Sequence, residues 1–491
     1  MKTELPRAKV PKYSLLADDI AKQVSGGVLQ PGDRIPSVRQ MSRERGVSIT
    51  TVLEAYRLLE DRGIIRAQPQ SGYFVAWRPS VSDRPEPTMS SASPWPSQVT
   101  IGELGANILL ESVSHGMVRF GAALPAPELL PNDRLNRILA SVARRGDIGR
   151  DLFGSIDGWE ELRRQIAQRR SMQGCVLDGD SLVMTSGCTE SLSLALQVTT
   201  KPGDLVAVES PTYFGILQIL EVLGLRALEI PTHPRTGMSV EALEFALLHD
   251  DVRAVVVMTN FSNPLGCSMP DAAKRRLVSM LAEKEIPLIE DDVDGELYHG
   301  GSRPTLAKCY DRQGLVLLCS SFSKDIAPSY RVGWIAPGRF LKRVKHVRGA
   351  LAGRAPLMMQ VVLAEYLSHG GYEHHLRRLR RAYAERVNHM AQAVVDQFPE
   401  GTRVSTPTGG YVLWVEMPQS VDALTLFRMA LEAGISVVPG HVFSVGSHFN
   451  NCVRLNAAYW SKRTEPALAR LAEMANQLAD ARSSRPASRL P

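Results

Sequence analysis

Hydrophobic positions follow two different patterns along the chain, which predicts a helical head followed by a longer α/β body. Near the start, Leu16, Ile20 and Val24 recur every four residues and form one apolar helix face, which ends at Gly26-Gly27. Downstream, short apolar runs such as LVMTS, LVAVES, AVVVMTN, PLIEDD and LVLLCSS alternate with amphipathic stretches. Such alternation predicts a parallel sheet with helices on both faces. A chain of 491 residues is too long for a single hydrophobic core of ordinary size, so we expect two or three domains.

The head carries two more helix signals separated by a very short turn. Ser37 is a good N-cap for one helix, Gly46 ends it, and Ser48 caps the next. A tight turn of this kind predicts a helix-turn-helix, whose second helix presents its N-terminal residues to the edges of DNA bases. The side chains expected on the inner faces of the two helices are Val38, Met41, Val52, Tyr56 and Leu59.

A β-hairpin is expected to follow the third helix. Residues 64–66 and 73–76 flank the turn sequence Pro69-Gln70-Ser71-Gly72, which predicts a wing of two strands. The run PGDRIPSVRQMSRERGVSITTVLEAYRLLEDRGIIRAQPQSGYFV resembles the signature of the GntR family of regulators. By that resemblance the DNA contacts are made by Arg34, Arg39, Ser48, Ile49, Thr50, Thr51, Ser71 and Gly72. A plain three-helix interaction domain is the alternative.

Basic residues are concentrated in this head. Residues 1–78 contain 13 Lys and Arg against 8 Asp and Glu, whereas the formal charge of the whole chain is +6. Almost all of the excess positive charge therefore belongs to one small module, as expected for a protein that binds a polyanion such as duplex DNA. An ordinary solvated basic face would give a similar balance.

Composition divides the chain further. Between Arg78 and Thr100 the sequence is rich in Pro and Ser with little apolar periodicity, which predicts a flexible linker. We therefore expect a DNA-binding domain at 1–78, a linker at 79–100, a large domain at 101–478 and a disordered tail at 479–491. The six cysteines form no C-x-x-C pair, so neither a disulfide framework nor a metal site is indicated.

The run SSFSKDIAPSYRVGW carries the most specific chemistry in the body. Lys324 can form a Schiff base with an aldehyde cofactor, and Ser321, Ser323 and Arg331 can bind a phosphate group. Arginine suits this role because its planar fork matches two phosphate oxygens. Taken alone, S-x-S-K is a weak signal, and a surface lysine is the better interpretation of it. The other motifs decide between these interpretations.

Four further motifs supply groups that such a cofactor needs. Gly187, Cys188 and Thr189 stand where a strand meets an apolar helix, so their backbone amides and the helix dipole can receive a phosphate. The remaining candidates are Tyr213 for stacking on a pyridine ring, Asn263 for its phenolic oxygen and Asp291 for its nitrogen. Each candidate has a structural alternative. The segment at Gly187 would be a plain strand-to-helix turn, Tyr213 a core residue, Asn263 part of an Asn-Pro turn, and Asp291 one of several solvated acids at a strand end. Asp292 and Asp294 fit that last interpretation.

A series of short motifs resembles, in the same order, the motifs of a type I aminotransferase. Along the chain they are ALPAPELLP, FGSIDGWEELR, SGCTE, SPTYFG, NPLG, EDD, SFSK, R-x-G-W, PTGG and VRLN. With the GntR-like head, the chain resembles the MocR subfamily of transcriptional regulators. The resemblance implies the pyridoxal phosphate-dependent transferase fold of type I, with large and small subdomains, and pyridoxal 5′-phosphate as cofactor. It also implies a domain-swapped homodimer, and Arg454 as the clamp for a carboxylate of the effector.

Two positions depart from the family pattern. Relatives commonly have a tyrosine where this chain has Phe153, and that hydroxyl reaches the phosphate bound by the partner subunit. A second tyrosine, which bonds the phenolic oxygen of the cofactor, is replaced by Asp294. Both changes remove groups that tune catalysis but retain the lysine and the phosphate-binding residues. We therefore expect a domain kept for binding, with at most weak transaminase activity.

These observations favour a cytoplasmic, DNA-binding regulator that senses the cofactor or an amine or amino acid that reacts with it. An active aminotransferase with an appended DNA-binding domain is the second hypothesis. A DNA-binding protein whose body is only a dimerisation scaffold is the third. The chain has neither a signal-like apolar segment at its start nor a long apolar span.

Overall fold

The computed structural model of the chain consists of two compact units, one up to Asp83 and one formed by Arg84–Tyr298 and Arg303–Pro491. The described residues are 11–25, 29–30, 32–61, 64–68, 71–75, 84–92, 95–99, 116–145, 156–300, 302–353, 356–446 and 448–483. Phe153 and the predicted boundary at residue 78 lie outside them. No helix in these ranges combines the length and the hydrophobicity needed to cross a membrane.

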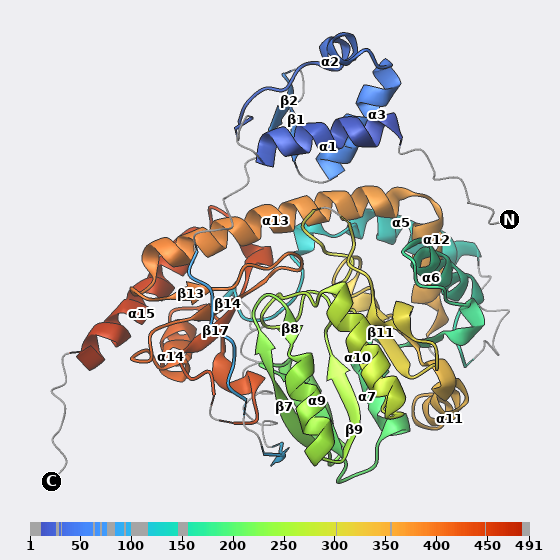
Figure 1. Cartoon of the computed structure of the whole chain (residues 1–491), viewed down its shortest axis with the longest axis vertical. Helices are drawn as coiled ribbons and strands as arrows, with labels where there is room; N and C mark the ends of the chain where they lie inside the picture. The colour runs from blue at the N-terminus through green and yellow to red at the C-terminus, as the bar shows by residue number, and fades with distance from the viewer. Residues whose placement is uncertain are drawn as a thin grey trace, which may run out of the picture. The chain divides into compact units, whose positions relative to one another are not determined.

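The first unit is a winged helix-turn-helix, as the pattern predicts (Figure 1). Its helices are α1 (Lys12–Ser25), α2 (Val38–Arg45) and α3 (Ile49–Asp61). The Ser37 side chain accepts a hydrogen bond from the backbone N–H of Gln40, and Gly46 ends α2 in the left-handed conformation (φ 61°) that glycine adopts readily. Both cap predictions are confirmed. Tyr56 of α3 is fully buried and donates a hydrogen bond to the carbonyl of Pro36 (2.7 Å).

The wing is a hairpin of β1 (Ile65–Gln68) and β2 (Gly72–Val75), paired antiparallel with Ile65 opposite Val75. A short segment before α2 adds to it, because Arg34 forms an isolated antiparallel bridge with Phe74. The core beneath combines α1, α2, α3 and the hairpin in a single apolar cluster that includes Ile20, Met41, Val52, Leu59 and Val75. Val38, which we expected in this core, is half-buried and packs against it.

A nine-stranded sheet forms the centre of the second unit. Its main path runs β3 (Ser97–Gln98), β7 (Arg226–His233), β6 (Leu205–Ser210), β9 (Val252–Val257), β10 (Leu288–Asp291), β11 (Val316–Ser321), β12 (Gly333–Ala336) and β5 (Val183–Thr185), with β8 (Gly237–Met238) on β7. The strands from β7 to β11 are parallel, whereas β12 runs antiparallel to both β11 and β5. The predicted parallel sheet is therefore confirmed from β7 to β11, while β12 and β3, towards the two ends of the sheet, pair antiparallel with their neighbours.

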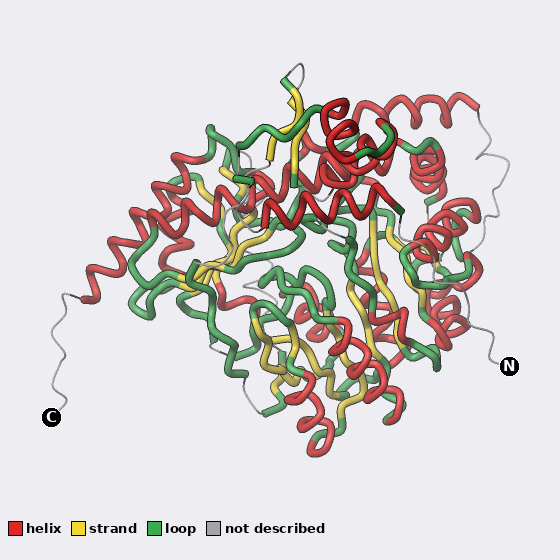
Figure 2. The backbone as a smooth tube through the Cα atoms, turned by 45° about the horizontal axis from the view of Figure 1, so that its top comes forward, coloured by secondary structure: helices red, strands yellow, loops and turns green. Residues whose placement is uncertain are grey.

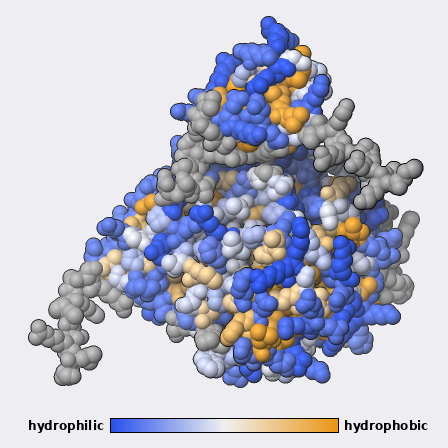
Figure 3. Space-filling model, in the orientation of Figure 1, coloured by the Kyte–Doolittle hydropathy of each residue, from blue (hydrophilic) through white to orange (hydrophobic). Residues whose placement is uncertain are grey.

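Helices cover both faces of this sheet (Figures 1 and 2). Val206 and Val208 of β6 pack in one apolar cluster with α7 (Cys188–Thr199) and α8 (Phe214–Val222). Leu205 and Ala207 point to the opposite face and pack with α9 (Val240–His249) and α10 (Asp271–Glu283). The other helices of this part are α5 (Asn132–Arg145), α6 (Glu160–Met172), α11 (Leu341–Leu351), α12 (Leu357–Ser368) and α13 (Gly371–Gln397). Figure 3 shows an apolar surface patch over α9.

A smaller four-stranded sheet completes the second unit. Its strands are β13 (Arg403–Val404), β14 (Val412–Glu416), β17 (Cys452–Asn456) and β16 (Val438–Pro439), all antiparallel to their neighbours. Helices α14 (Ala423–Glu432) and α15 (Glu465–Ser483) belong to this region, and β15 (Ile435–Ser436) pairs with β4 (Val118–Arg119). Helix α15 continues past residue 479, where we expected a disordered tail to begin. Residues from 484 onward lie outside the described part.

The segment predicted to be a flexible linker is hydrogen-bonded to the second unit at several of its described residues. The carbonyl of Pro85 accepts a hydrogen bond from the backbone N–H of Val404 (2.9 Å), and the backbone N–H of Thr88 donates to Glu416 (3.0 Å). Further on, β3 pairs with the edge strand β7. Composition does not indicate this docking, because the partners come from strands more than a hundred residues away.

Candidate functional site

The exposed end of α3 has the geometry of a recognition helix. Ser48 caps it, since its hydroxyl oxygen accepts a hydrogen bond from the backbone N–H of Thr51 (3.1 Å). Ile49 is 49% exposed, which is unusual for a large apolar side chain, and Thr50 beside it is also exposed. Arg39, on α2, is exposed as well. Polar, apolar and cationic groups are therefore available for base edges and phosphates.

Arg34 and Gly72 lie together in the wing. A Cβ atom placed on Gly72 would stand 3.4 Å from Nε of Arg34, and Gly72 has a φ of +105°, which side-chain-bearing residues rarely adopt. Arg34 and Ser71 are exposed. These positions suit contacts to a phosphate backbone, and the DNA contacts stay predictions.

In the second unit, the predicted phosphate-binding residues gather at one end of the large sheet. Ser321 pairs with Gly333 across β11 and β12, and Gly333 pairs with Thr185 on β5, directly before α7. Gly187, the N-cap of α7, has a φ of +117°, and a Cβ atom there would lie 2.6 Å from Nη2 of Arg331. The helix N-terminus and a guanidinium thus form a cradle that only glycine leaves open.

Hydroxyl groups line the same cradle. The backbone N–H of Ser323 donates to the hydroxyl of Ser321 (3.4 Å), and Oγ of Ser323 is buried with no hydrogen-bond partner among the described residues. Thr189, in the first turn of α7, is exposed. A buried hydroxyl without a partner is costly unless a ligand satisfies it. These groups fit the phosphate of a bound cofactor.

Lys324 is positioned immediately after these serines. Its Nζ donates a hydrogen bond to the backbone carbonyl of Ala123 (2.5 Å), which also accepts one from the hydroxyl of Tyr411 (3.1 Å). Burial lowers the pKa of the Lys324 ammonium, although the nearby Asp294 carboxylate acts in the opposite direction. A lowered pKa favours the neutral amine that can attack an aldehyde.

Asp291 ends β10 and is 2% exposed. Burial raises the pKa of its carboxyl to about 7, while the thiol of Cys188 (3.3 Å) and the backbone N–H of Val293 (3.1 Å), which donate to Oδ1, act against this increase. Asp291 is therefore linked directly to the start of α7 through Cys188. A carboxyl group at this position can pair with a pyridine nitrogen.

Neither of the other two acids after β10 is solvated, so the alternative that we kept for them is wrong. Asp292 is 2% exposed and forms ion pairs with Arg303 and with Arg170 (3.4 Å). Asp294 is 7% exposed, and burial raises its pKa while Lys324 lowers it. Sequence spacing could not distinguish these acids from a solvated strand end, because Arg170 is distant in sequence and Lys324 comes from the turn after another strand, β11.

The remaining site residues converge on Arg454. This side chain on β17 is 1% exposed, and its Nη1 and Nη2 donate to Oδ1 of Asn263 (3.0 Å) and to the carbonyl of Gly121 (2.6 Å). Burial lowers its pKa to about 10, and Tyr213, Tyr411 and Asp294 partly offset that effect. The large and small sheets therefore contribute to one site.

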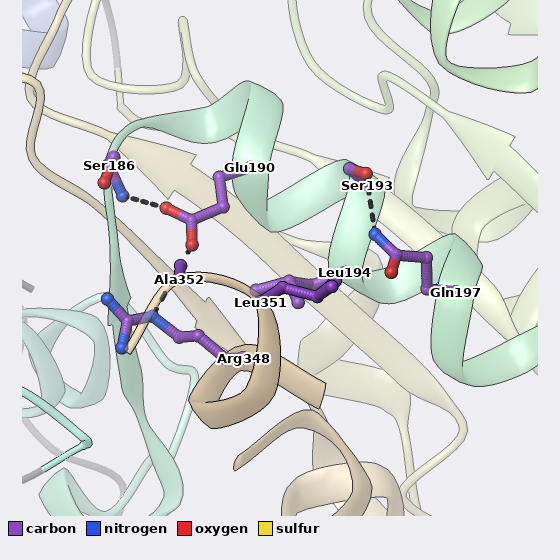
Figure 4. Close-up of a pocket in the computed structure, with 8 residues that line it drawn as sticks. All are labelled: Ser186, Glu190, Ser193, Leu194, Gln197, Arg348, Leu351 and Ala352. Atoms are coloured by element: carbon purple, nitrogen blue, oxygen red, sulfur yellow. Dashed lines mark hydrogen bonds and ion pairs between the residues drawn. The ribbon is translucent and has the colours of Figure 1, made fainter. Parts of the chain in front are cut away.

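A cavity of about 360 Å³ adjoins the start of α7 (Figure 4). Glu190 accepts a hydrogen bond from the backbone N–H of Ser186 (2.5 Å) and faces the buried Arg348, whose Nε lies 3.6 Å from Oε1 of Glu190. Leu194 and Leu351 line the apolar part of the cavity. Our sequence analysis did not select Glu190 or Arg348. The run LKRVKHVRG has the composition of a solvated basic helix, and only the tertiary structure reveals that Arg348 is buried.

Comparison with known proteins separates the two units in the same way. Residues 12–75 match the family of bacterial regulatory proteins named gntR, and residues 132–471 match aminotransferase class I and II. The chain is 40% identical to the uncharacterized HTH-type transcriptional regulator YdcR of Escherichia coli K12 over 94% of its length and 98% of that protein. It is 39% identical to the uncharacterized regulator YjiR of the same organism over 91% and 95%.

Solved structures resemble the second unit. The α-aminoadipate aminotransferase LysN of Thermus thermophilus, crystallised with N-(5′-phosphopyridoxyl)-L-leucine, aligns with a TM-score of 0.71 at 28% identity, and the alignment covers 76% of this chain and 95% of LysN. The site residues described above therefore lie on the type I fold of pyridoxal phosphate-dependent transferases. The chain belongs to the aminotransferase class I and II family and, with its gntR-type head, to the regulators of the MocR type.

Proposed function

We propose that this protein is a DNA-binding transcriptional regulator whose aminotransferase-like body holds pyridoxal 5′-phosphate and responds to an amine or amino acid. The observation that carries this proposal is the joint presence, in one chain, of an exposed recognition helix and a buried Lys324 beside an open phosphate cradle. The relatives named as HTH-type transcriptional regulators, which match over nearly the full length, support the same combination.

In this proposal the cradle at Gly187 and Arg331, with the unpartnered hydroxyl of Ser323, binds the phosphate of the cofactor. Asp291 pairs with the pyridine nitrogen. Burial raises the pKa of its carboxyl to about 7 without the cofactor, and the cationic ring nitrogen would lower that pKa and favour the carboxylate. When bound, the cofactor supplies the aldehyde with which amines react. Lys324 supplies the attachment point.

Duplex DNA is the partner of the head, and we propose a homodimer that contacts two half-sites. The body is more suited to binding than to turnover. Asp294 cannot provide the hydroxyl that a tyrosine at its position would offer, and its charge opposes the loss of a proton from Lys324. An active aminotransferase is the second candidate, and the complete set of Lys324, Asp291 and Arg454 is what favours it.

The proposal is tested by measuring binding of the full-length protein to its own promoter region, with and without candidate amines. Binding should weaken steeply as salt increases, since neutralised phosphates release counterions. Arg39→Ala should weaken binding by about tenfold, which corresponds to one lost charge-assisted contact. Arg253→Ala removes an exposed arginine from the body and serves as the matched control.

An added amine should alter the affinity or footprint of the wild type, while Lys324→Ala should bind DNA but ignore the amine. If the wild type fails to bind promoter DNA at low salt, the regulator proposal is wrong. If it binds DNA but turns over an amino acid and a 2-oxo acid at the roughly 10 per second typical of enzymes, the second candidate is favoured.

A further inference from the structure

Asp294 is a buried carboxylate that lacks a hydrogen-bond donor. It lies in the loop after β10, is 7% exposed, and its Oδ1 has no partner among the described residues. An ionised carboxylate can only accept hydrogen bonds, and leaving one unpaired inside a protein is costly. A group of this kind beside a ligand site indicates that the ligand provides the missing donor.

Neither cation beside Asp294 donates a hydrogen bond to its Oδ1. Nζ of Lys324 donates one hydrogen bond to the carbonyl of Ala123 (2.5 Å), and Nη1 and Nη2 of Arg454 donate to Asn263 and Gly121, while Nε of Arg454 has no partner among the described residues. These two residues reduce the electrostatic cost of the carboxylate, since both lower the pKa of Asp294 against the effect of burial. They do not supply its hydrogen bond.

We propose that Asp294 binds a second ammonium group of the effector, so that the protein responds to a diamine or a diamino acid rather than to a simple monoamine. This assignment rests on the proposed function. One amino group of the effector replaces Lys324 on the aldehyde carbon of the cofactor. The carbon–nitrogen bond to Nζ breaks as the bond to the effector forms, and the hydrogens of the effector nitrogen pass to Nζ without any oxidation or reduction. The other ammonium donates to Asp294.

A set of three ligands of equal chain length isolates the charge. Cadaverine carries a terminal ammonium, 5-aminopentan-1-ol a terminal hydroxyl, and n-pentylamine a terminal methyl group. A charge-assisted hydrogen bond is about twice as strong as a neutral one. We therefore expect cadaverine to have the lowest apparent Kd, about tenfold or more below that of n-pentylamine, with the alcohol between them.

The measurement is a spectrophotometric titration of the full-length protein loaded with pyridoxal 5′-phosphate, at pH 8, where the terminal amine is protonated. Asp294→Asn keeps the shape of the side chain and removes its charge. In this variant the apparent Kd values of n-pentylamine and cadaverine should become nearly equal, mainly because cadaverine binds more weakly. A DNA-binding assay with the same ligands should give the same order of potency.

The possible failures are distinguishable. If the wild type has no cofactor absorption band, the proposed function is wrong, and this assignment falls with it. If the band is present but the wild type binds cadaverine and n-pentylamine equally, the assignment alone is wrong. The same holds if the wild type prefers cadaverine and Asp294→Asn keeps that preference. Because the comparison of ligands uses only the wild type, a variant that folds poorly does not affect that test.

Discussion

Replacing Asp291 by Asn should change how the stability of the cofactor-free protein depends on pH. The carboxyl group is 2% exposed, and burial raises its pKa from 3.8 to about 7. A group whose pKa is higher in the folded state binds a proton more tightly there than in the unfolded chain. Its contribution to stability is therefore complete below about pH 4 and is lost as the pH rises towards 7.

The size of the effect follows from that pKa. A change from 3.8 to about 7 corresponds to a total loss of about 4 kcal/mol, of which about 2 kcal/mol falls between pH 5.5 and 8. Asp291→Asn cannot lose a proton from this position. Compared with wild type, the variant should therefore gain about 2 kcal/mol of relative stability over that range.

Urea denaturation of the cofactor-free protein, followed by tryptophan fluorescence at several pH values, measures this difference. Other buried acids such as Asp325, whose pKa burial raises to about 6 without a contribution from Asp291, titrate in both proteins and cancel in the comparison. Added pyridoxal 5′-phosphate should stabilise the wild type more than Asp291→Asn, because only a carboxylate pairs with a protonated pyridine nitrogen. If the free energy of unfolding changes with pH in the same way in the two proteins, the reasoning is refuted.

Three further substitutions test the site. Gly187→Ala places a methyl group 2.6 Å from Nη2 of Arg331 and should weaken cofactor binding at least tenfold by absorbance titration, whereas Gly203→Ala, also at positive φ but in open space, should not; equal affinities would exclude the cradle. Lys324→Ala should abolish the band that borohydride fixes, and a peptide label on another lysine would contradict the attachment point. Arg454→Ala should raise the concentration of a carboxylate-bearing effector needed for a spectral change by about 10 to 100-fold. If the titration is unchanged, Arg454 does not bind the carboxylate.

Much of the architecture could be predicted from local pattern. Helix caps at Ser37 and Gly46 and the short turn before Ser48 are local features, so the helix-turn-helix was predictable from neighbouring residues alone. The motif around Lys324 was predictable for the same reason, since Ser321 ends β11 and Ser323 and Lys324 follow in the turn after it. The antiparallel strand β12 was not, because strand direction depends on how a connection closes in space.

What the sequence by itself determined is the inventory of chemistry: a basic head, a lysine beside hydroxyls and an arginine, and three acids at a strand end. Tertiary structure decided what each of those acids does. Asp291 is linked to Cys188, Asp292 is neutralised by arginines, and Asp294 is left without a donor beside Lys324. The acids are nearly identical in sequence context, but burial and the charges brought by distant strands and helices differ at each position, and these set both ionisation and partner.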